Sequence, residues 1–210
     1  MENKEQKIKI FESEVNRRLK VVWQDGKKLL NTKNTNYSYG TLVDVLEHGL
    51  DTIPISKVSS VLLLGMGAGS IIESLRTKYD SDAPVTAVEL DPVVIKLAHK
   101  KFNIEHIENV HIHNMDAWDY VAQCDTQFDL IIVDIFIDIH VPDKFYKPKF
   151  WKMIEKIVTP NGFVLFNAGI DLDEAHAQKF VAELPDSFIY QKNYNVLQSN
   201  TVIIMQKVFN

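Results

Sequence analysis

The sequence predicts an α/β protein built on a doubly wound parallel sheet, and two observations support this. From Val58 onward, segments typical of buried strands alternate with helical segments, which is the pattern of such a sheet. The first of these strands also runs directly into a glycine turn and a helix. Seven strands are expected, with the last two joined near Asn195 as an antiparallel pair. They are residues 61–64, 85–90, 109–113, 128–134, 163–166, 188–194 and 196–208.

The segment before this sheet has a different sequence pattern. Residues 8–11, 19–23 and 27–32 resemble strands, and Asp25-Gly26 is a strong hairpin signal between the last two. We therefore expect a small β-hairpin appendage over residues 1–36 and the larger domain over residues 37–210. A polar linker is expected at residues 31–36, and an amphipathic helix at residues 41–50.

Composition narrows the class of protein. The 210 residues are 46% hydrophobic and 24% charged, which is typical of a globular domain. A net charge of −5 disfavours nucleic-acid binding through phosphate neutralisation. Cys124 is alone, and neither a signal peptide nor a membrane-spanning run is visible. These features predict a cytoplasmic protein with neither nucleic acid nor membrane as a partner.

The glycine turn predicts a nucleoside-binding site. Gly65, Gly67 and Gly69 allow the backbone to approach a ligand closely, and Ser70 and Glu73 match a capping box that would start a helix at Ile71. The exposed N–H groups of that helix suit a polar or anionic ligand group. Glu89 ends the next strand about twenty residues after the turn, where an acid can accept both ribose hydroxyls.

Two further acids follow strands of the same sheet. Asp116 is expected to cap a helix over residues 116–123, as Asp91 caps the helix that begins at Pro92. Asp134 ends the most apolar strand, at the edge where open α/β sheets place their ligand chemistry. Asp134 is therefore the candidate general base.

The order of these motifs resembles class I S-adenosylmethionine-dependent methyltransferases, which have a Rossmann-like sheet. A dinucleotide-binding fingerprint would require glycine where Ser70 stands, which disfavours an NAD-dependent oxidoreductase. Within the methyltransferase fold, the stretches VLLLGMGAGS, VELDP, the D-A pair at Asp116 and FDLIIVD resemble the spermidine synthase superfamily of polyamine aminopropyltransferases. The resemblance covers roughly residues 18–168.

This resemblance implies roles for particular residues. The nucleoside cofactor, S-adenosylmethionine or its decarboxylated form, would be bound by Gly65, Gly67, Gly69, Glu89, Leu90, Asp116 and Ala117. Asp134 would take a proton from the attacking group. Tyr37 and Tyr39, in the tyrosine-containing segment, could form a wall of the substrate pocket or simply pack the appendage onto the core. A homodimer is also implied.

The sequence departs from the spermidine synthase pattern in the segments that would contact the transferred group and its acceptor. Ala68 stands where the family carries an acid in the glycine loop, and 134–138 read D-I-F-I-D in place of D-S-S-D-P. An acid expected after the tyrosine segment is also missing. Because a dicationic polyamine needs paired carboxylates, these departures favour methyl transfer to another small acceptor. Aminopropyl transfer and a non-catalytic nucleoside-binding or assembly role are the alternatives.

The irregular segment after Asp134 contains further candidates. Asp138 and His140 are expected in the substrate pocket, with His140 as an alternative base, although solvent exposure alone also explains polar loop residues. His111 and His113 share one face of a strand but lack a third ligand at metal-binding spacing. No metal site is expected.

Overall fold

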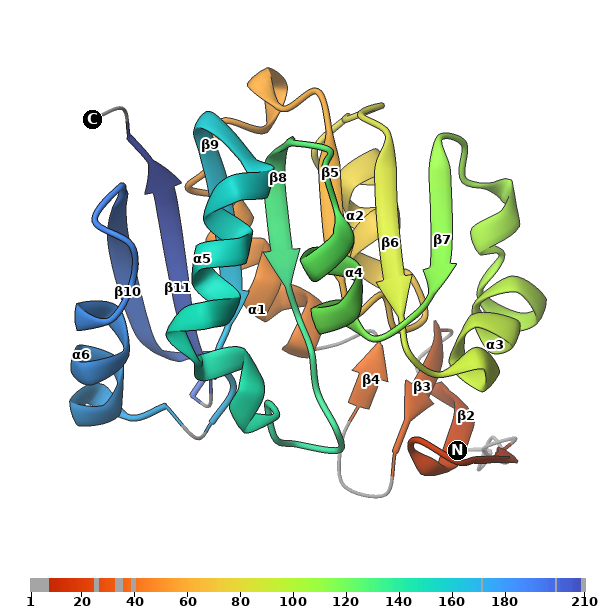
Figure 1. Cartoon of the computed structure of the whole chain (residues 1–210). Helices are drawn as coiled ribbons and strands as arrows, with labels where there is room; N and C mark the ends of the chain where they lie inside the picture. The colour runs from red at the N-terminus through yellow and green to blue at the C-terminus, as the bar shows by residue number, and fades with distance from the viewer. Residues whose placement is uncertain are drawn as a thin grey trace.

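The computed structural model describes residues 8–24, 27–32, 36–38, 41–170, 172–198 and 200–208. Its main element is a seven-stranded sheet of order β10-β11-β9-β8-β5-β6-β7 (Figure 1). The strands are β5 (Val61–Leu64), β6 (Val85–Glu89), β7 (Val110–Asn114), β8 (Phe128–Val133), β9 (Val158–Asn167), β10 (Phe188–Val196) and β11 (Asn200–Lys207). β5 to β9 are parallel, whereas β11 is antiparallel to both of its neighbours. The predicted sheet, its seven strands and its antiparallel last pair are confirmed.

Helices cover both faces of this sheet (Figure 1). One face carries α1 (Thr41–Leu50), α2 (Ser70–Thr77) and α3 (Pro92–Phe102), and the other carries α4 (Ala117–Gln123), α5 (Pro148–Ile157) and α6 (Glu174–Ala182). Short 3₁₀ turns lie at Ile55–Lys57, Ile104–His106 and Asp143–Tyr146. In β8, Ile131 and Val133 point to one layer, and Leu130 and Ile132 to the other. A strand covered on both faces must be apolar throughout, which explains the continuous hydrophobic run.

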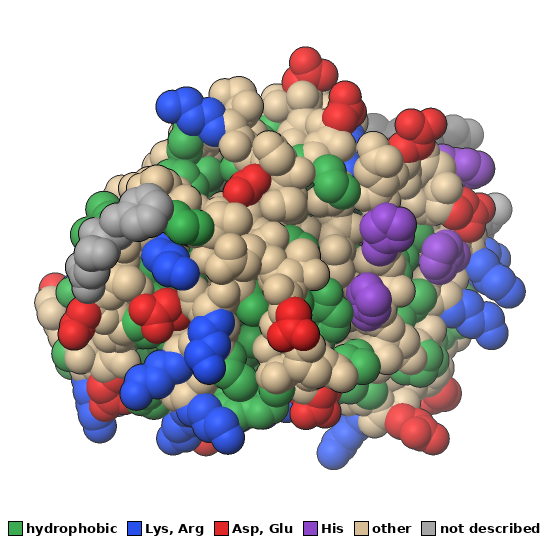
Figure 2. Space-filling model, turned by 45° about the horizontal axis from the view of Figure 1, so that its top comes forward, with side chains coloured by type: hydrophobic (Ala, Val, Ile, Leu, Met, Phe, Trp, Pro, Cys, Tyr) green, Lys and Arg blue, Asp and Glu red, His purple; other side chains and the backbone are tan. Residues whose placement is uncertain are grey.

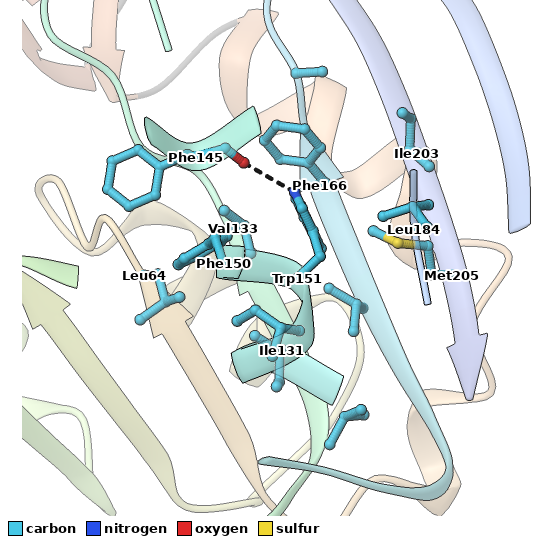
Figure 3. Close-up of a cluster of buried hydrophobic side chains, with 14 of the residues drawn as sticks. Leu64, Ile131, Val133, Phe145, Phe150, Trp151, Phe166, Leu184, Ile203 and Met205 are labelled. Atoms are coloured by element: carbon cyan, nitrogen blue, oxygen red, sulfur yellow. Dashed lines mark hydrogen bonds between the residues drawn. The ribbon is translucent and has the colours of Figure 1, made fainter. Parts of the chain in front are cut away.

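Aromatic side chains fill the layer under α5 (Figure 3). Trp151 is 1% exposed, and its ring centroid lies 5.0 Å from that of Phe166 and 5.3 Å from that of Phe180. The buried indole N–H donates a 2.9 Å hydrogen bond to the backbone oxygen of Phe145 (Figure 3). This bond satisfies a polar group that would otherwise destabilise the core, and it ties α5 to the segment that precedes it.

The N-terminal appendage is a four-stranded antiparallel sheet, which has more strands than the predicted hairpin. Its strands, in sheet order, are β1 (Lys9–Ser13), β2 (Arg17–Gln24), β3 (Lys27–Asn31) and β4 (Asn36–Ser38). The turn at residues 25–26 lies outside the described residues, and the strands on either side of it pair antiparallel. β4 pairs with β3 and takes in Asn36, the last residue of the expected linker. The division of the chain after residue 36 stays a prediction.

The small sheet lies at the carboxyl edge of the parallel strands (Figure 1). Asp91, which is fully buried, accepts hydrogen bonds from the hydroxyl of Ser13 and, at 2.7 Å, from the side-chain amide of Asn16. The hydroxyl of Thr32 donates to the Asp138 carboxylate at 2.8 Å. Three hydrogen bonds between polar side chains therefore attach the appendage beside the ends of β6 and β8.

Several element boundaries differ from expectation. The predicted capping box is wrong: α2 begins at Ser70 itself, and Gly69 occupies the cap position with φ 90° and no side-chain cap bond. β9 begins at Val158, ahead of the strand expected at residues 163–166. Asp173 caps α6 through a 2.9 Å bond from the backbone N–H of His176. β10 continues past Asn195 to Val196.

Acidic and basic side chains are interspersed over the face of the molecule in Figure 2. Among the described residues, every helix is too short or too polar to cross a membrane.

Candidate functional site

A pocket of about 220 Å³ lies at the carboxyl edge of the sheet, between the small sheet and the ends of β5, β6 and β8. The chain reverses its winding direction at β5, because β6 lies on one side of it and β8 on the other. Crevices at such a switch point are the usual ligand sites of open α/β sheets. The pocket is lined by the β5–α2 loop, the segment after β8, α1 and the β1–β2 turn.

The β5–α2 loop depends on glycine for steric reasons. Gly65 has φ +87°, and a Cβ there would lie 2.1 Å from the backbone oxygen of Asp134. A backbone atom cannot move away as a side chain can, so a larger residue would separate the loop from the end of β8. Gly67 also has positive φ, at 56°. The loop is therefore held in direct contact with the strand end that carries the candidate base.

Glu89 forms the β6 side of the pocket and is 6% exposed. One carboxylate oxygen accepts a 3.0 Å bond from the Asp91 N–H, and the other a 3.0 Å bond from the Gly67 N–H. Burial raises the pKa of Glu89 to about 7, while these two N–H bonds act in the opposite direction. Each oxygen keeps a second lone pair, so the side chain can still accept two ligand hydroxyls.

Asp116 forms the neighbouring corner of the pocket together with Lys144. One Asp116 oxygen caps α4 through a 2.8 Å bond from the Trp118 N–H, as the sequence predicts. The other lies 2.6 Å from the Lys144 ammonium. Both side chains line the pocket, so a ligand in this corner meets an acid that is already paired with a lysine. The sequence contains no spacing signal for Lys144, because a long irregular segment brings it to Asp116.

Asp134 lies on the opposite side of the glycine loop. Its carboxylate accepts a 2.9 Å bond from the side-chain amide of Asn167, at the end of β9. The Asn167 oxygen in turn accepts from the side-chain amide of Asn200 at 2.9 Å and from the Gly169 N–H at 3.2 Å, which fixes the orientation of the amide. Burial raises the pKa of Asp134 to about 6, and the Asn167 bond opposes this rise. A carboxylate with this pKa is ionised at neutral pH and can accept a proton.

The structure brings most of the predicted site residues together. Gly65, Gly67, Glu89, Leu90, Asp116, Ala117 and Asp134 all line the one pocket. Gly69 lies outside the lining, and a Cβ there would be 2.6 Å from the Cδ1 of Ile104. Its role is to terminate the loop in a left-handed conformation.

Of the residues that were predicted to bind the acceptor, those whose side chains the structure describes are not found in the pocket lining. Asp138 and His140 are not among the described residues that line the pocket, whereas Ile137 and Ile139 are. The side chain of Tyr37 and the whole of Tyr39 lie outside the described residues, so their pocket roles stay predictions.

No metal site is expected from the sequence, because the histidine pair on the third strand lacks a third ligand at metal-binding spacing. Both His111 and His113 are exposed, on the edge strand β7. Within the ranges that the structure describes, no three His, Cys, Asp or Glu side chains gather as metal ligands.

Sequence reasoning missed the polar residues that position or pair with the acids. Asn16, Lys144, Asn167 and Asn200 come from four separate segments. Only Asn167 carries a recognisable signal, because it ends an apolar strand at the same edge as Asp134.

Comparison with known proteins identifies the family. The model of the spermine/spermidine synthase domain matches residues 45–184. The chain belongs to this family. The matched residues contain the β5–α2 loop, Glu89, Asp116 and Asp134, so these parts of the pocket lining lie within the matched domain.

Curated relatives of this spermidine synthase-like chain are of two kinds. A polyamine aminopropyltransferase from Oceanobacillus iheyensis is 26% identical over 181 residues, which cover 80% of the chain and 32% of that protein. An eEF1A lysine and N-terminal methyltransferase homolog from Drosophila melanogaster is 28% identical over 116 residues, or 51% of the chain and 17% of that protein. The chain thus spans less than half the length of either relative.

Solved structures support the fold. A probable spermidine synthase from Corynebacterium glutamicum aligns with a TM-score of 0.66 at 18% identity, covering 99% of the chain and 78% of that structure. Human methyltransferase-like protein 13, in complex with SAH, aligns with a TM-score of 0.58 at 19% identity, covering 80% of each chain. The predicted Rossmann-like methyltransferase fold is therefore confirmed.

Proposed function

We propose that the chain is an S-adenosylmethionine-dependent transferase that moves a methyl group to a small acceptor, with Asp134 as the general base. The observation that carries this proposal is the placement of two carboxylates, buried Glu89 and half-buried Asp134, on either side of one glycine loop. Gly67 donates to Glu89, and Gly65 packs directly against the backbone of Asp134. A nucleoside bound at Glu89 would therefore present its reactive end close to Asp134.

The pocket residues fit a nucleoside. Glu89 retains lone pairs for two hydroxyls, and it is held rigidly by two backbone N–H groups. Asp116 and Lys144 supply an acceptor and a donor for a base edge, and Leu90 and Met115 supply apolar surface beside them. These features would place the nucleoside between the ends of β6 and β7 and its substituents over the glycine loop.

For methyl transfer, the protein has to position the cofactor and the acceptor and to remove one proton from the acceptor. S-adenosylmethionine supplies a methyl carbon bonded to a positively charged sulfur, and the C–S electron pair stays on sulfur when that bond breaks. Asp134 holds the acceptor's N–H or O–H and takes its proton as the new bond to carbon forms. Asn167 keeps the carboxylate oriented toward the pocket through its 2.9 Å bond.

Methyl transfer is preferred over aminopropyl transfer because of what surrounds the glycine loop. Ala68 is 4% exposed and belongs to a hydrophobic cluster with Leu19 and Leu30 of the small sheet. It thus offers no carboxylate for the amine of decarboxylated S-adenosylmethionine. Aminopropyl transfer is the second candidate, and the family match over residues 45–184 is the observation that favours it.

Calorimetry tests the nucleoside site directly. S-adenosylmethionine, its decarboxylated form and methylthioadenosine are titrated into wild type, Glu89→Ala and the control Glu73→Ala, which alters an exposed residue of α2. We expect S-adenosylmethionine to bind wild type and the control alike, and Glu89→Ala at least about tenfold more weakly, equivalent to about 1.4 kcal/mol. If none of the three nucleosides binds wild type, the proposal is wrong.

Turnover then separates the possible functions. Methyl-labelled S-adenosylmethionine is incubated with wild type, a panel of amines and hydroxylated metabolites, and the products are identified by mass spectrometry. Labelled acceptor supports the proposal, and its formation should be lost in Asp134→Asn. Transfer from the decarboxylated form to putrescine would establish the second candidate. Persistent binding without product would indicate a non-catalytic nucleoside-binding protein.

A further inference from the structure

We propose that the acceptor has an apolar body and a single ionisable nucleophile, and that the pocket excludes diamines. This inference rests on the proposed function, because it names the acceptor class of the same site. It concerns the acceptor half of the pocket, which we define as Asp134 with the apolar residues that surround it. These apolar residues are Ile135, Phe136, Ile137, Ile139 and Ile170.

A turn in the β8–α5 segment decides which side chains enter this half. Ile137 and His140 pair through their backbones, with N···O distances of 2.9 and 3.2 Å, and Asp138 has φ 57° within the turn. Ile137 and Ile139 line the pocket on either side of Asp138. The Asp138 carboxylate is held instead by the hydroxyl of Thr32 at 2.8 Å. The turn thus presents two isoleucines to the pocket and draws its acid toward the small sheet.

Close packing fixes the rest of the apolar wall. Gly169 has φ +68°, and a Cβ there would lie 2.9 Å from the Phe136 ring. The ring therefore seats against the backbone immediately before Ile170. Ile137 and Ile170 are 48% and 50% exposed, so the apolar lining of the acceptor half includes side chains that are accessible to solvent. An apolar body of the acceptor would cover this surface, which favours binding.

Most of the charged side chains in the pocket already have partners within the protein. Four ionisable side chains line it among the described residues. Glu89 accepts two backbone N–H bonds, and Asp116 is paired with Lys144. Asp134 is left to receive the nucleophile. A second ammonium group of a diamine would enter the isoleucine wall without a carboxylate, and an unpaired buried charge is strongly unfavourable.

A matched pair of amines tests this inference. Hexylamine and 1,6-diaminohexane have the same chain length and differ in the second amine. Their binding to the full chain is measured by calorimetry at pH 8, with and without saturating S-adenosylhomocysteine. We expect hexylamine to bind at least about tenfold more tightly than the diamine, since a desolvated unpaired ammonium costs more than the about 1.4 kcal/mol that tenfold represents.

A paired substitution shows whether the isoleucine wall is responsible. Ile137→Asp adds a carboxylate to the lining of the pocket that contains Asp134, and the ratio of the two affinities should shift toward the diamine by at least about tenfold. The control Ile189→Asp makes the same change on β10, where the side chain is 55% exposed, and should leave the ratio unchanged. An unchanged ratio in Ile137→Asp would overturn the assignment of the wall.

Different results would contradict the inference about the acceptor and the proposed transferase function. Equal or tighter binding of the diamine to wild type, or no binding of hexylamine, overturns the inference about the acceptor even when S-adenosylhomocysteine binds. Failure of S-adenosylhomocysteine to bind contradicts the proposed function, and the amine ratio measured without it still tests the wall.

Discussion

Asp134→Asn should abolish transfer and at the same time stabilise the protein at alkaline pH. Burial raises the pKa of Asp134 from an ordinary value of 3.8 to about 6, so the folded state binds this proton more tightly than the unfolded state does. At about 1.4 kcal/mol per pKa unit, ionising the folded protein costs about 3 kcal/mol of stability. Asparagine stays neutral, and its oxygen can still accept the bond from Asn167.

The sign of the effect follows from the two pKa values. Below pH 3.8 the carboxyl is protonated in both states, and the substitution should leave stability nearly unchanged. As the pH rises from 3.8 to about 6 the unfolded state ionises first, so the free energy of unfolding of wild type falls relative to that of the variant. Above about pH 6 the full difference, up to about 3 kcal/mol, should be present.

Urea denaturation at pH 4, 5, 6 and 8 measures this difference. The control is Asp143→Asn, which removes an exposed acid from the segment that follows β8 and should change stability by less than about 0.5 kcal/mol at each pH. If Asp134→Asn is no more stable than wild type at pH 8, or if the difference between them does not grow with pH, the raised pKa of Asp134 is refuted.

Three further results are expected. Asn167→Leu removes the amide donor to Asp134 and should raise the pKa of that carboxyl above 6 by about one pKa unit, measured by a carboxyl-carbon NMR titration; an unchanged value would contradict the network. Gly65→Ala should destabilise more than Gly69→Ala in urea, because its Cβ would lie 2.1 Å from a backbone oxygen rather than 2.6 Å from a flexible side chain; equal costs would refute this contrast. Asp91→Ala should expose the β1–β2 segment to limited proteolysis, and unchanged resistance would show that other contacts hold the small sheet.

Controls accompany the first and last of these variants. Asn200→Ala removes the partner of the Asn167 oxygen and leaves the donor to Asp134 in place, so the pKa of Asp134 should stay near 6. Asp119→Ala removes an exposed acid from α4 and should leave the proteolysis pattern unchanged.

Local patterns predicted the main sheet well because its strands and turns are encoded within short segments. The run from Val61 to Leu64 is apolar throughout, since helices cover both faces of the sheet, and the glycines that follow have the positive φ that the turn requires. Asp91 and Asp116 cap their helices as expected. Ser70 misled the prediction because a serine followed by Glu73 satisfies the capping-box pattern, whereas Gly69 in a left-handed conformation already terminates the loop.

The candidate site was predictable only where a strand end identifies it. Glu89 and Asp134 each follow an apolar strand, and parallel strands bring their carboxyl ends to one edge. Only their polarity predicts Asp138 and His140 as site residues, and a polar residue in a loop can point in any direction. The turn that pairs Ile137 with His140 determines that the isoleucines line the pocket.

The sequence by itself determined the doubly wound sheet, the glycine loop and the two acids that face a common edge, because strand periodicity and turn chemistry act over a few residues. Tertiary structure alone decided how those acids are supported. Asn167, Lys144 and the small sheet reach them from distant parts of the chain, and Ala68 lies in the contact with that sheet. Such long-range contacts leave no periodic trace in the sequence, since they depend on how whole elements pack.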